Sequence, residues 1–294
     1  MPAPSPLVDV AWLAAHAGDP RVRVLDVRWY LGPRRGADEY TRGHLPGAAF
    51  VDVNRELASP PSSGPGRHPL PTKDAFVRAL SRLGVGRDTL VVAYDDAGGA
   101  IAARLWWLLR HFGHGGGRVL DGGITAWTGA GHPLSTDVPV IAPAEPLDLA
   151  SGPAGDVIDR TRVDALRREL SAGHAPGNAV ILDARAPDRY EGKVEPIDAR
   201  PGHVPGARSA PFAGNLAPGG VFLDREALAD RYGRLGALDA ERVVCYCGSG
   251  VTACHDLLAL ALLGREDAML YEGSWSDWAS DPSLPAALGP EPGG

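Results

Sequence analysis

The chain has 294 residues, which is enough for about two domains of ordinary size. Hydrophobic residues make up 44% of it and charged residues 22%, and this composition excludes wholesale disorder. The 29 Lys and Arg residues and the 36 Asp and Glu residues give a net charge of −7, opposite in sign to that of a general nucleic-acid-binding protein.

Neither a membrane span nor a disulfide framework is expected. The longest apolar run, from Leu257 to Leu263, is far shorter than the ~20 residues that cross a bilayer. Residues 1–18 lack the basic stretch of a secretory signal, and the cysteines are an odd number clustered in one short segment. We therefore expect a cytoplasmic protein, in which a cysteine acts as a thiol, a thiolate or a metal ligand.

Five sequence blocks of the first half recur in the same order in the second half. The order is kept while the offset drifts by a few residues, as in two copies of one domain whose loops differ in length. The matching blocks are residues 21–30 with 178–187, 44–48 with 203–207, 82–84 with 234–236, 91–94 with 243–246, and 121–127 with 272–278. We predict a first domain over 1–135, a linker rich in Pro, Ala and Gly over 136–156, and a second domain over 157–294.

Within the second copy, apolar strands alternate with amphipathic helices. The predicted elements are a helix over 158–170, a strand over 180–182, a helix over 224–235, a strand over 243–246, a helix through 255–263, a strand over 269–271 and a helix beginning near Trp275. This alternation predicts an α/β fold of two tandem domains, each a mainly parallel sheet flanked by helices on both faces.

The loop after the strand 243–246 carries the candidate chemistry. Cys247 lies at the carboxyl end of that strand, where open parallel sheets bind ligands. The two glycines of the loop allow successive N–H groups to turn inward and form an anion-binding nest, which the N-terminus of the next helix reinforces. We predict that this cradle stabilises a Cys247 thiolate; its members are Gly248, Ser249, Gly250, Val251 and Thr252.

In the first copy, Asp95 stands at the position that matches Cys247. That copy therefore has no nucleophilic sulfur, and we expect it to be non-catalytic. A second carboxylate site formed by Asp95 and Asp96 is the alternative.

The two HxPGA blocks, the loop CGSGVTA at 247–253 and the segment EGSWSDW at 272–278 resemble the two-domain rhodanese-type sulfurtransferases, over nearly the whole chain. The resemblance implies that only the C-terminal rhodanese domain is catalytic and that no cofactor or metal is needed. It implies that Cys247 takes a sulfane sulfur from a small-molecule donor and becomes a persulfide. The sulfur then passes to a thiol, such as thioredoxin or glutathione, or to cyanide. No nucleic acid or membrane partner is expected.

The loop sequence favours 3-mercaptopyruvate over thiosulfate as the donor. Thiosulfate-preferring members have basic residues directly after the cysteine, whereas Cys-Gly-Ser-Gly-Val-Thr resembles the 3-mercaptopyruvate sulfurtransferases. A thiosulfate:cyanide sulfurtransferase with the same persulfide remains the alternative. Arg189 falls where the family places a substrate-binding arginine, suited to a carboxylate. A second such arginine of the animal enzymes falls near Ile197, and Arg200 is the candidate substitute.

Ser249 is the second predicted catalytic residue. The resemblance to the 3-mercaptopyruvate enzymes implies a Cys–Ser–Asp proton relay, but Asn54 stands at the position of the aspartate. An amide cannot accept a proton at neutral pH, so we expect Ser249 to act as a hydrogen-bond donor.

Three other interpretations use the same loop. A cysteine phosphatase would need Cys-x5-Arg, but Ala253 occupies the arginine position. A zinc site could draw on Cys245, Cys247, Cys254 and His255, although their spacing is unusual. A sulfur-carrier module without turnover would have the same loop.

Other polar residues present in both copies are expected to be structural. We expect His44 and His203 to brace matched loops. Asp26 and Asp183 are expected to pair with Arg28 and Arg185 or to cap nearby backbone.

Overall fold

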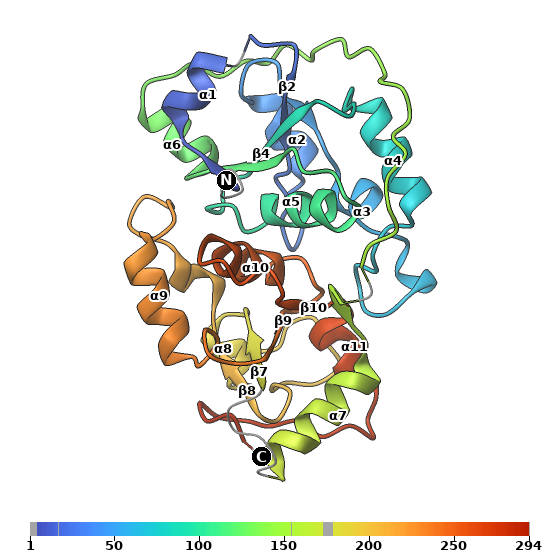
Figure 1. Cartoon of the computed structure of the whole chain (residues 1–294), viewed down its shortest axis with the longest axis vertical. Coiled ribbons are helices and arrows are strands. Elements are labelled where there is room, and N and C mark those ends of the chain that lie inside the picture. The colour runs from blue at the N-terminus through green and yellow to red at the C-terminus, as the bar shows by residue number, and fades with distance from the viewer. Residues whose placement is uncertain (1–4, 17, 154, 173–178, 294) are drawn as a thin grey trace. The chain divides into compact units, whose positions relative to one another are not determined.

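The computed structural model describes residues 5–16, 18–153, 155–172 and 179–293, and the chain forms two compact units (Figure 1). Unit 1 comprises the chain up to Ser59, Pro71–Gly152 and Leu216–Phe222. Unit 2 comprises Pro60–Leu70, Pro153–Asn215 and the chain from Leu223 onward. Pro60–Leu70, from the first copy, therefore belongs to unit 2, and Leu216–Phe222, from the second copy, belongs to unit 1. A single boundary in the sequence does not predict this exchange.

Unit 1 is a parallel sheet with the strand order β1-β5-β4-β2-β3. Its strands are β1 (Leu7–Val8), β2 (Val22–Asp26), β3 (Ala49–Phe50), β4 (Leu90–Tyr94) and β5 (Gly117–Leu120). Its helices are α1 (Val10–His16), α2 (Gly36–Arg42), α3 (Val53–Glu56), α4 (Lys73–Arg82), α5 (Ala102–His111) and α6 (Gly123–Gly129).

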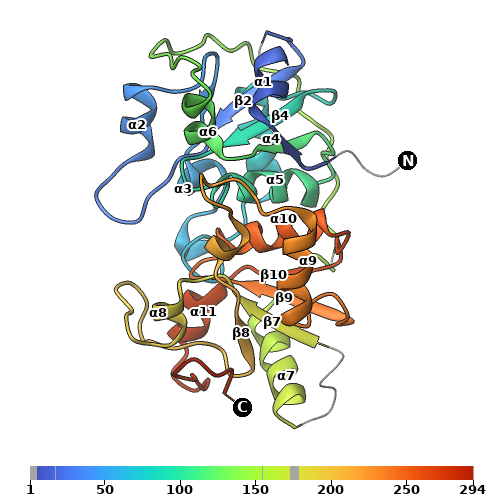
Figure 2. The same cartoon turned by 90° about the vertical axis from the view of Figure 1, so that its left-hand side faces the viewer.

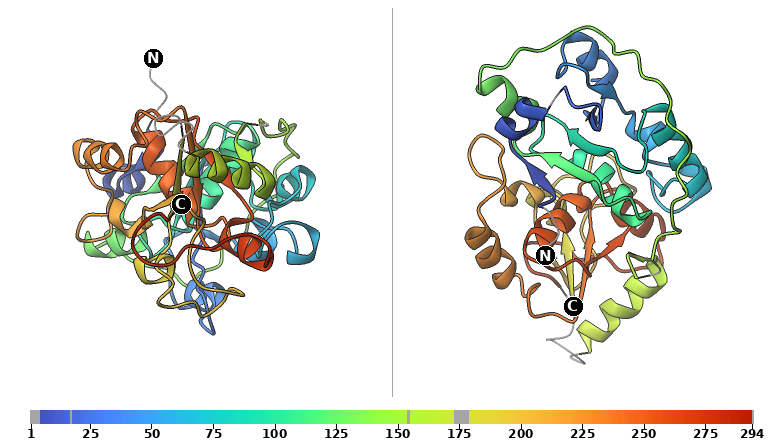
Figure 3. Two further views of the ribbon diagram at one scale, coloured as in Figure 1. Left: turned by 90° about the horizontal axis from the view of Figure 1, so that it is seen from below. Right: turned by 45° about the horizontal axis from the view of Figure 1, so that its top comes forward.

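Unit 2 repeats this order as β6-β10-β9-β7-β8, again with parallel neighbours. Its strands are β6 (Val157–Ile158), β7 (Ala179–Asp183), β8 (Ala207–Ser209), β9 (Arg242–Tyr246) and β10 (Met269–Tyr271). Its helices are α7 (Arg160–Ser171), α8 (Pro187–Tyr190), α9 (Arg225–Arg234), α10 (Ala253–Leu262) and α11 (Ser274–Ser280), with 3-10 turns η1 (Pro61–Ser63) and η2 (Phe212–Asn215). Strands β7, β9 and β10, coloured yellow to red, lie side by side in the right-hand view of Figure 3.

Helices cover both faces of the unit 2 sheet. Figure 2 shows α9 and α10 on one face and α7 and α11 on the other. Asp224 begins α9 as predicted, since its Oδ1 accepts a hydrogen bond from the Ala227 N–H at 2.8 Å. The predicted fold class, two parallel sheets each flanked by helices, is confirmed.

The core of unit 2 fixes α11, which begins beside the candidate site. Trp275 and Trp278 of this helix are fully buried, in one cluster with Val163 and Leu166 of α7. A buried tryptophan removes roughly 200 Å² from water, which stabilises the fold by roughly 5 kcal/mol at ~25 cal/mol per Å². The start of α11 is therefore a rigid support.

Polar residues shared by the two copies brace both sheets in the same way. Arg28 donates to Asp26 in unit 1 and Arg185 donates to Asp183 in unit 2, each pair with an Nη2–Oδ2 distance of 2.6 Å. These buried ion pairs confirm the structural role that the sequence predicts.

The two loop histidines also match. The His44 ring stacks on Tyr40 with centroids 3.9 Å apart, and the His203 ring stacks on Tyr190 at 3.7 Å. Both ring nitrogens of each histidine lie within hydrogen-bond distance of backbone carbonyls. Their predicted role in bracing the loops is confirmed. Within the described residues, no helix is long and apolar enough to cross a bilayer.

Candidate active site

Cys247 directly follows β9, the middle strand of the unit 2 sheet, and its backbone is tied to the start of α11. Its N–H donates to Ser274 Oγ at 3.1 Å, and its carbonyl accepts from the Trp275 N–H at 2.9 Å. The residue is only 2% exposed. Ser274 has a positive φ of 54°, which is unfavourable for a residue with a side chain, and so it is held by its surroundings.

The loop after Cys247 needs glycine at one position. Gly250 has a φ of +77°, and a Cβ there would lie 2.5 Å from the carbonyl oxygen of Glu272. A side chain at this position would clash with backbone. The Gly248 carbonyl accepts from the Ser276 N–H at 3.0 Å, so this loop, like Cys247, is attached to α11.

The matching loop of unit 1 shows how this loop type holds a carboxyl group. Asp95 directly follows β4 and is fully buried, and its carboxylate oxygens accept four hydrogen bonds from main-chain N–H groups at 2.7–2.8 Å. Oδ1 accepts from Ala97 and Gly99, and Oδ2 accepts from Ile101 and Ala102. Burial raises the pKa of Asp95 above its ordinary value, and these four amides oppose the rise.

This arrangement also bears on the alternative carboxylate site in unit 1. Asp96 turns to other partners: its Oδ2 accepts from the Tyr30 hydroxyl at 2.6 Å and lies 3.5 Å from Arg34 Nη2. Because four amides already surround Asp95, the pair is poorly placed to act jointly on a substrate.

Cys247 takes the place of Asp95 when β4 is aligned with β9. In that register the amides of Ala97 and Gly99 correspond to those of Ser249 and Val251. Within the described residues, the Ser249 and Val251 N–H groups have no protein acceptor. The loop thus keeps donors that the first copy uses to hold a carboxylate.

The structure adds a partner for Ser249 that the sequence did not predict. His68 Nδ1 lies 2.7 Å from Ser249 Oγ, and both residues are buried. His68 belongs to the segment Pro60–Leu70, which is part of unit 2. Asn54, in contrast, lies in unit 1 and accepts from Trp29 Nε1 at 3.2 Å.

A sequence signal for this segment does exist. The corresponding stretch of the second copy, residues 212–222, contains no histidine or arginine, whereas residues 60–70 contain Arg67 and His68. An Arg-His pair that appears in only one copy of a repeat points to a function of that copy's loop rather than to the shared fold.

Two guanidinium groups approach the residue after Cys247. Arg189, at the end of α8, binds Glu195 at 2.8 Å and Asp198 at 3.0 Å through Nη2. Arg67 forms an ion pair with the same Asp198. A Cβ at Gly248 would lie 3.0 Å from Arg67 Nη2 and 3.3 Å from Arg189 Nη1.

Arg200 has a different environment from the one expected for a substrate-binding residue. Its Nη2 donates to the carbonyl oxygens of Trp278 at 3.3 Å and Asp281 at 2.9 Å, so it caps the end of α11. Ile197, at the position of the family's second arginine, is 39% exposed. These contacts favour a structural role for Arg200.

Cys245 and Cys254 are both buried in the fold. Cys245 is fully buried in β9, and burial, with Asp256 nearby, raises the pKa of its thiol well above the usual range. Cys254 Sγ donates to the Gly250 carbonyl at 3.4 Å. Among the residues described, no three His, Cys, Asp or Glu side chains are grouped to hold a metal ion.

Comparison with known proteins identifies the family. The Rhodanese-like domain matches residues 9–130 and 165–281. The chain is 43% identical to the probable 3-mercaptopyruvate sulfurtransferase of Pseudomonas aeruginosa, over 96% of this chain and 98% of that protein. It is 41% identical to the putative thiosulfate sulfurtransferase SseB of Mycobacterium tuberculosis, over 96% and 97%.

A solved structure agrees with these relatives. The crystal structure of SseA from Escherichia coli, described among the 3-mercaptopyruvate sulfotransferases, matches with a TM-score of 0.78 and 33% identity. The match covers 93% of this chain and all of that one. The chain therefore belongs to the rhodanese family of sulfurtransferases.

Proposed function

We propose that the protein transfers a sulfane sulfur from 3-mercaptopyruvate to a thiol or cyanide acceptor through a persulfide on Cys247. The observation that carries this proposal is the Asp95 carboxylate, held by four main-chain amides in the first copy. Cys247 occupies the matching position, so the same loop type is suited to a sulfur anion there. The cradle comprises Gly248, Ser249, Gly250, Val251 and Thr252.

The first half-reaction breaks one carbon–sulfur bond and forms one sulfur–sulfur bond. The Cys247 thiolate attacks the donor sulfur, and the electron pair of the C–S bond passes to the enolate of pyruvate. The proton lost by the donor thiol balances the proton that this enolate gains when it becomes pyruvate.

In the second half-reaction, an acceptor thiolate or cyanide attacks the outer sulfur and restores the Cys247 thiolate. Thioredoxin, glutathione and cyanide have the required nucleophile. The scheme balances without an added oxidant, reductant or cofactor.

We infer that Ser249 and His68 together move the proton. Histidine is the side chain whose ordinary pKa lies nearest neutral pH, and its ring can exchange a proton with the donor through the Ser249 hydroxyl. The 2.7 Å contact between His68 Nδ1 and Ser249 Oγ supports this role. It extends the hydrogen-bonding role expected for Ser249 from the sequence.

Arg189 is the proposed binding residue for the donor carboxylate, since a guanidinium presents paired donors to two oxygens. Its position beside Gly248 supports this assignment. Thiosulfate is the alternative donor, and the name of the M. tuberculosis relative, a putative thiosulfate sulfurtransferase, supports it.

Side-by-side steady-state kinetics test the proposal. We expect kcat/KM to be higher for 3-mercaptopyruvate than for thiosulfate, and Arg189→Ala to raise KM for 3-mercaptopyruvate by about 10-fold or more. A preference for thiosulfate would contradict the donor assignment. Single loading of sulfur without turnover of either donor would indicate a sulfur carrier.

A further inference from the structure

We propose that Glu272 is a positioning residue of the active site: the hydrogen bond that it accepts from the Leu70 N–H holds the His68 ring in place. The inference rests on the proposed function, because this ring and Ser249 form its proton path. Glu272 directly follows β10 and is half-buried, and its Oε2 lies 3.1 Å from the Leu70 nitrogen. His68 stands two residues before Leu70, in the segment Pro60–Leu70 of unit 2.

The chain between this hydrogen bond and the His68 ring is short and stiff. Only Pro69 separates His68 from Leu70. The proline ring fixes its own backbone angle φ at about −65° and restricts the backbone of the preceding residue, which is His68. A shift of the Leu70 backbone is therefore passed on to His68, because the intervening bonds have little freedom to absorb it.

The segment is attached to the start of α11 on the other side of His68. Gly66 has a φ of +70°, and a Cβ there would lie 2.4 Å from the carbonyl oxygen of Gly273, so this close approach requires glycine. The Arg67 N–H donates to Ser276 Oγ at 3.1 Å. The proposed hydrogen bond is thus one of two attachments, and its loss should displace the His68 ring without releasing the whole segment.

Glu272 also borders the loop that carries Ser249. A Cβ on Gly250, the residue after Ser249, would lie 2.5 Å from the Glu272 carbonyl oxygen. The main chain of Glu272 therefore lies beside one partner of the proton path, while its side chain holds the segment of the other partner, His68. Since a misplacement of about 1 Å can cost on the order of 100-fold in rate, a residue that ties both partners to one point is suited to maintain their distance.

The first copy has the same hydrogen bond without the histidine. At the matching position, Asp121 directly follows β5, and its Oδ1 accepts from the Phe222 N–H at 2.8 Å. Phe222 corresponds to Leu70 in the aligned copies, and two residues earlier Gly220 stands where the other copy has His68. The hydrogen bond therefore holds the segment in both units, and the segment of unit 2 adds a group that can transfer a proton.

The test measures pyruvate release in a single turnover with 3-mercaptopyruvate, which isolates the first half-reaction. Glu272→Met keeps the length of the side chain but loses the acceptor oxygen. We expect its maximal rate constant to fall about 10-fold, while the donor concentration that gives half of this rate stays within about twofold. Glu272→Gln keeps an oxygen that can accept the hydrogen bond and should stay within about twofold of the wild-type rate. A single-turnover rate constant does not depend on the folded fraction of the sample, so partial unfolding is not mistaken for a slower step.

The decisive comparison introduces Glu272→Met into the His68→Gln variant. Because Glu272 acts through the ring that this variant lacks, we expect a further loss of less than about twofold. The comparison with the wild-type background separates an effect through His68 from a general effect on the fold.

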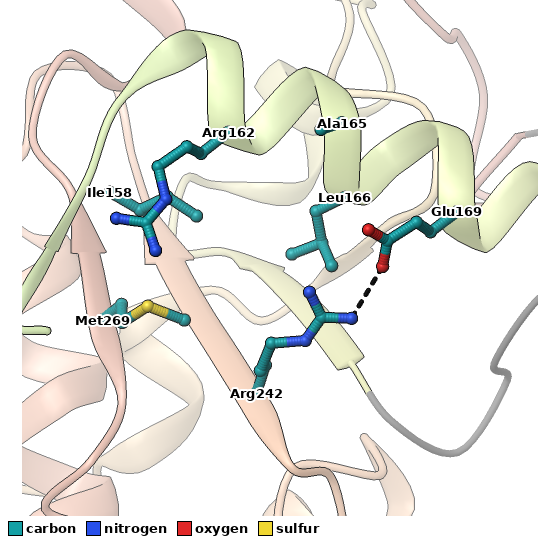
Figure 4. Close-up of a pocket in the computed structure, with 7 residues that line it drawn as sticks. All are labelled: Ile158, Arg162, Ala165, Leu166, Glu169, Arg242 and Met269. Carbon is teal, nitrogen blue, oxygen red and sulfur yellow. Dashed lines mark hydrogen bonds and ion pairs between the residues drawn. The ribbon is translucent and has the colours of Figure 1, made fainter.

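Two variants serve as controls. Asp121→Leu loses the equivalent hydrogen bond of unit 1 and should leave the rate unchanged. Arg242→Ala removes a charge from unit 2 at a distant place. Arg242 pairs with Glu169 at 2.7 Å in the pocket of Figure 4, at the start of β9, whereas Cys247 follows the end of that strand. This variant should also retain the wild-type rate.

Equal losses in the two backgrounds would show that Glu272 only supports the fold, and an unchanged rate in Glu272→Met would show that its hydrogen bond does not position the ring. A loss in Glu272→Gln as large as that in Glu272→Met would show that the charge, and not the hydrogen bond, matters. Each of these results overturns the inference. If the wild-type protein itself formed no Cys247 persulfide, the proposed function would fail instead, and the two failures are thus distinguished.

Discussion

Asp95 and Cys247 occupy equivalent positions in the two copies of the fold, each directly after the middle strand of its sheet. The buried Asp95 carboxyl group accepts hydrogen bonds from four main-chain amides. The duplicated loop holds a carboxyl group in the first copy, and we propose that it holds a sulfur anion in the second.

Replacing the Asp95 carboxylate by an amide tests the anion-holding property of this loop. Asp95→Asn keeps the shape but turns an NH2 group toward two of the four N–H donors, leaving them without an acceptor. We expect the free energy of unfolding to fall by about 2–3 kcal/mol. Chemical denaturation measures the change, with Asp96→Asn as the neighbouring control, and a loss no greater than that of the control would contradict the argument.

Ser249 and His68 are expected to act as one unit. Ser249→Ala and His68→Gln should each lower kcat by about 100-fold, the lower end of the usual contribution of proton transfer. Because each variant interrupts the same path, the double variant should be little worse than either single one. Independent, multiplicative losses in the steady-state rates would show that the two residues do not share a proton path.

Asp256 makes the stability of unit 2 depend on pH. It lies fully buried in α10, and burial raises its pKa from 3.8 to about 7. Its Oδ1 accepts from Asn215 and Tyr232, while Oδ2 is buried with no partner in the described residues, as suits a neutral carboxyl group.

The folded protein keeps this proton to a higher pH than the unfolded chain does. The stabilising contribution is therefore complete below pH 4 and is lost as the pH rises to about 7. Asp256→Asn, which cannot ionise, should flatten the dependence of the melting temperature on pH over this range and be relatively more stable at pH 8. A variant with the same pH dependence as the wild type would contradict this assignment.

The sequence predicts most of the fold because repeats and strand–helix alternation are local signals. The place of Cys247 at the end of β9 and the ion pairs of Asp26 and Asp183 follow from such signals. The contact of His68 with Ser249 could not be predicted in this way, since the segment Pro60–Leu70, rich in Gly and Pro, has no periodicity that indicates which unit it joins. Arg200 lies three residues after Ile197, the position of the family's second arginine, but its guanidinium group binds carbonyl oxygens at the end of α11.

The most direct test of the central claim is the mass of the Cys247 peptide after the protein is incubated with 3-mercaptopyruvate and digested without reductant. We predict that this peptide gains the mass of one sulfur atom and loses it again when dithiothreitol is added. Cys245→Ser and Cys254→Ser should show the same gain, and Cys247→Ser should show none and lose turnover. Sulfur on another cysteine, or turnover by Cys247→Ser, would contradict the account.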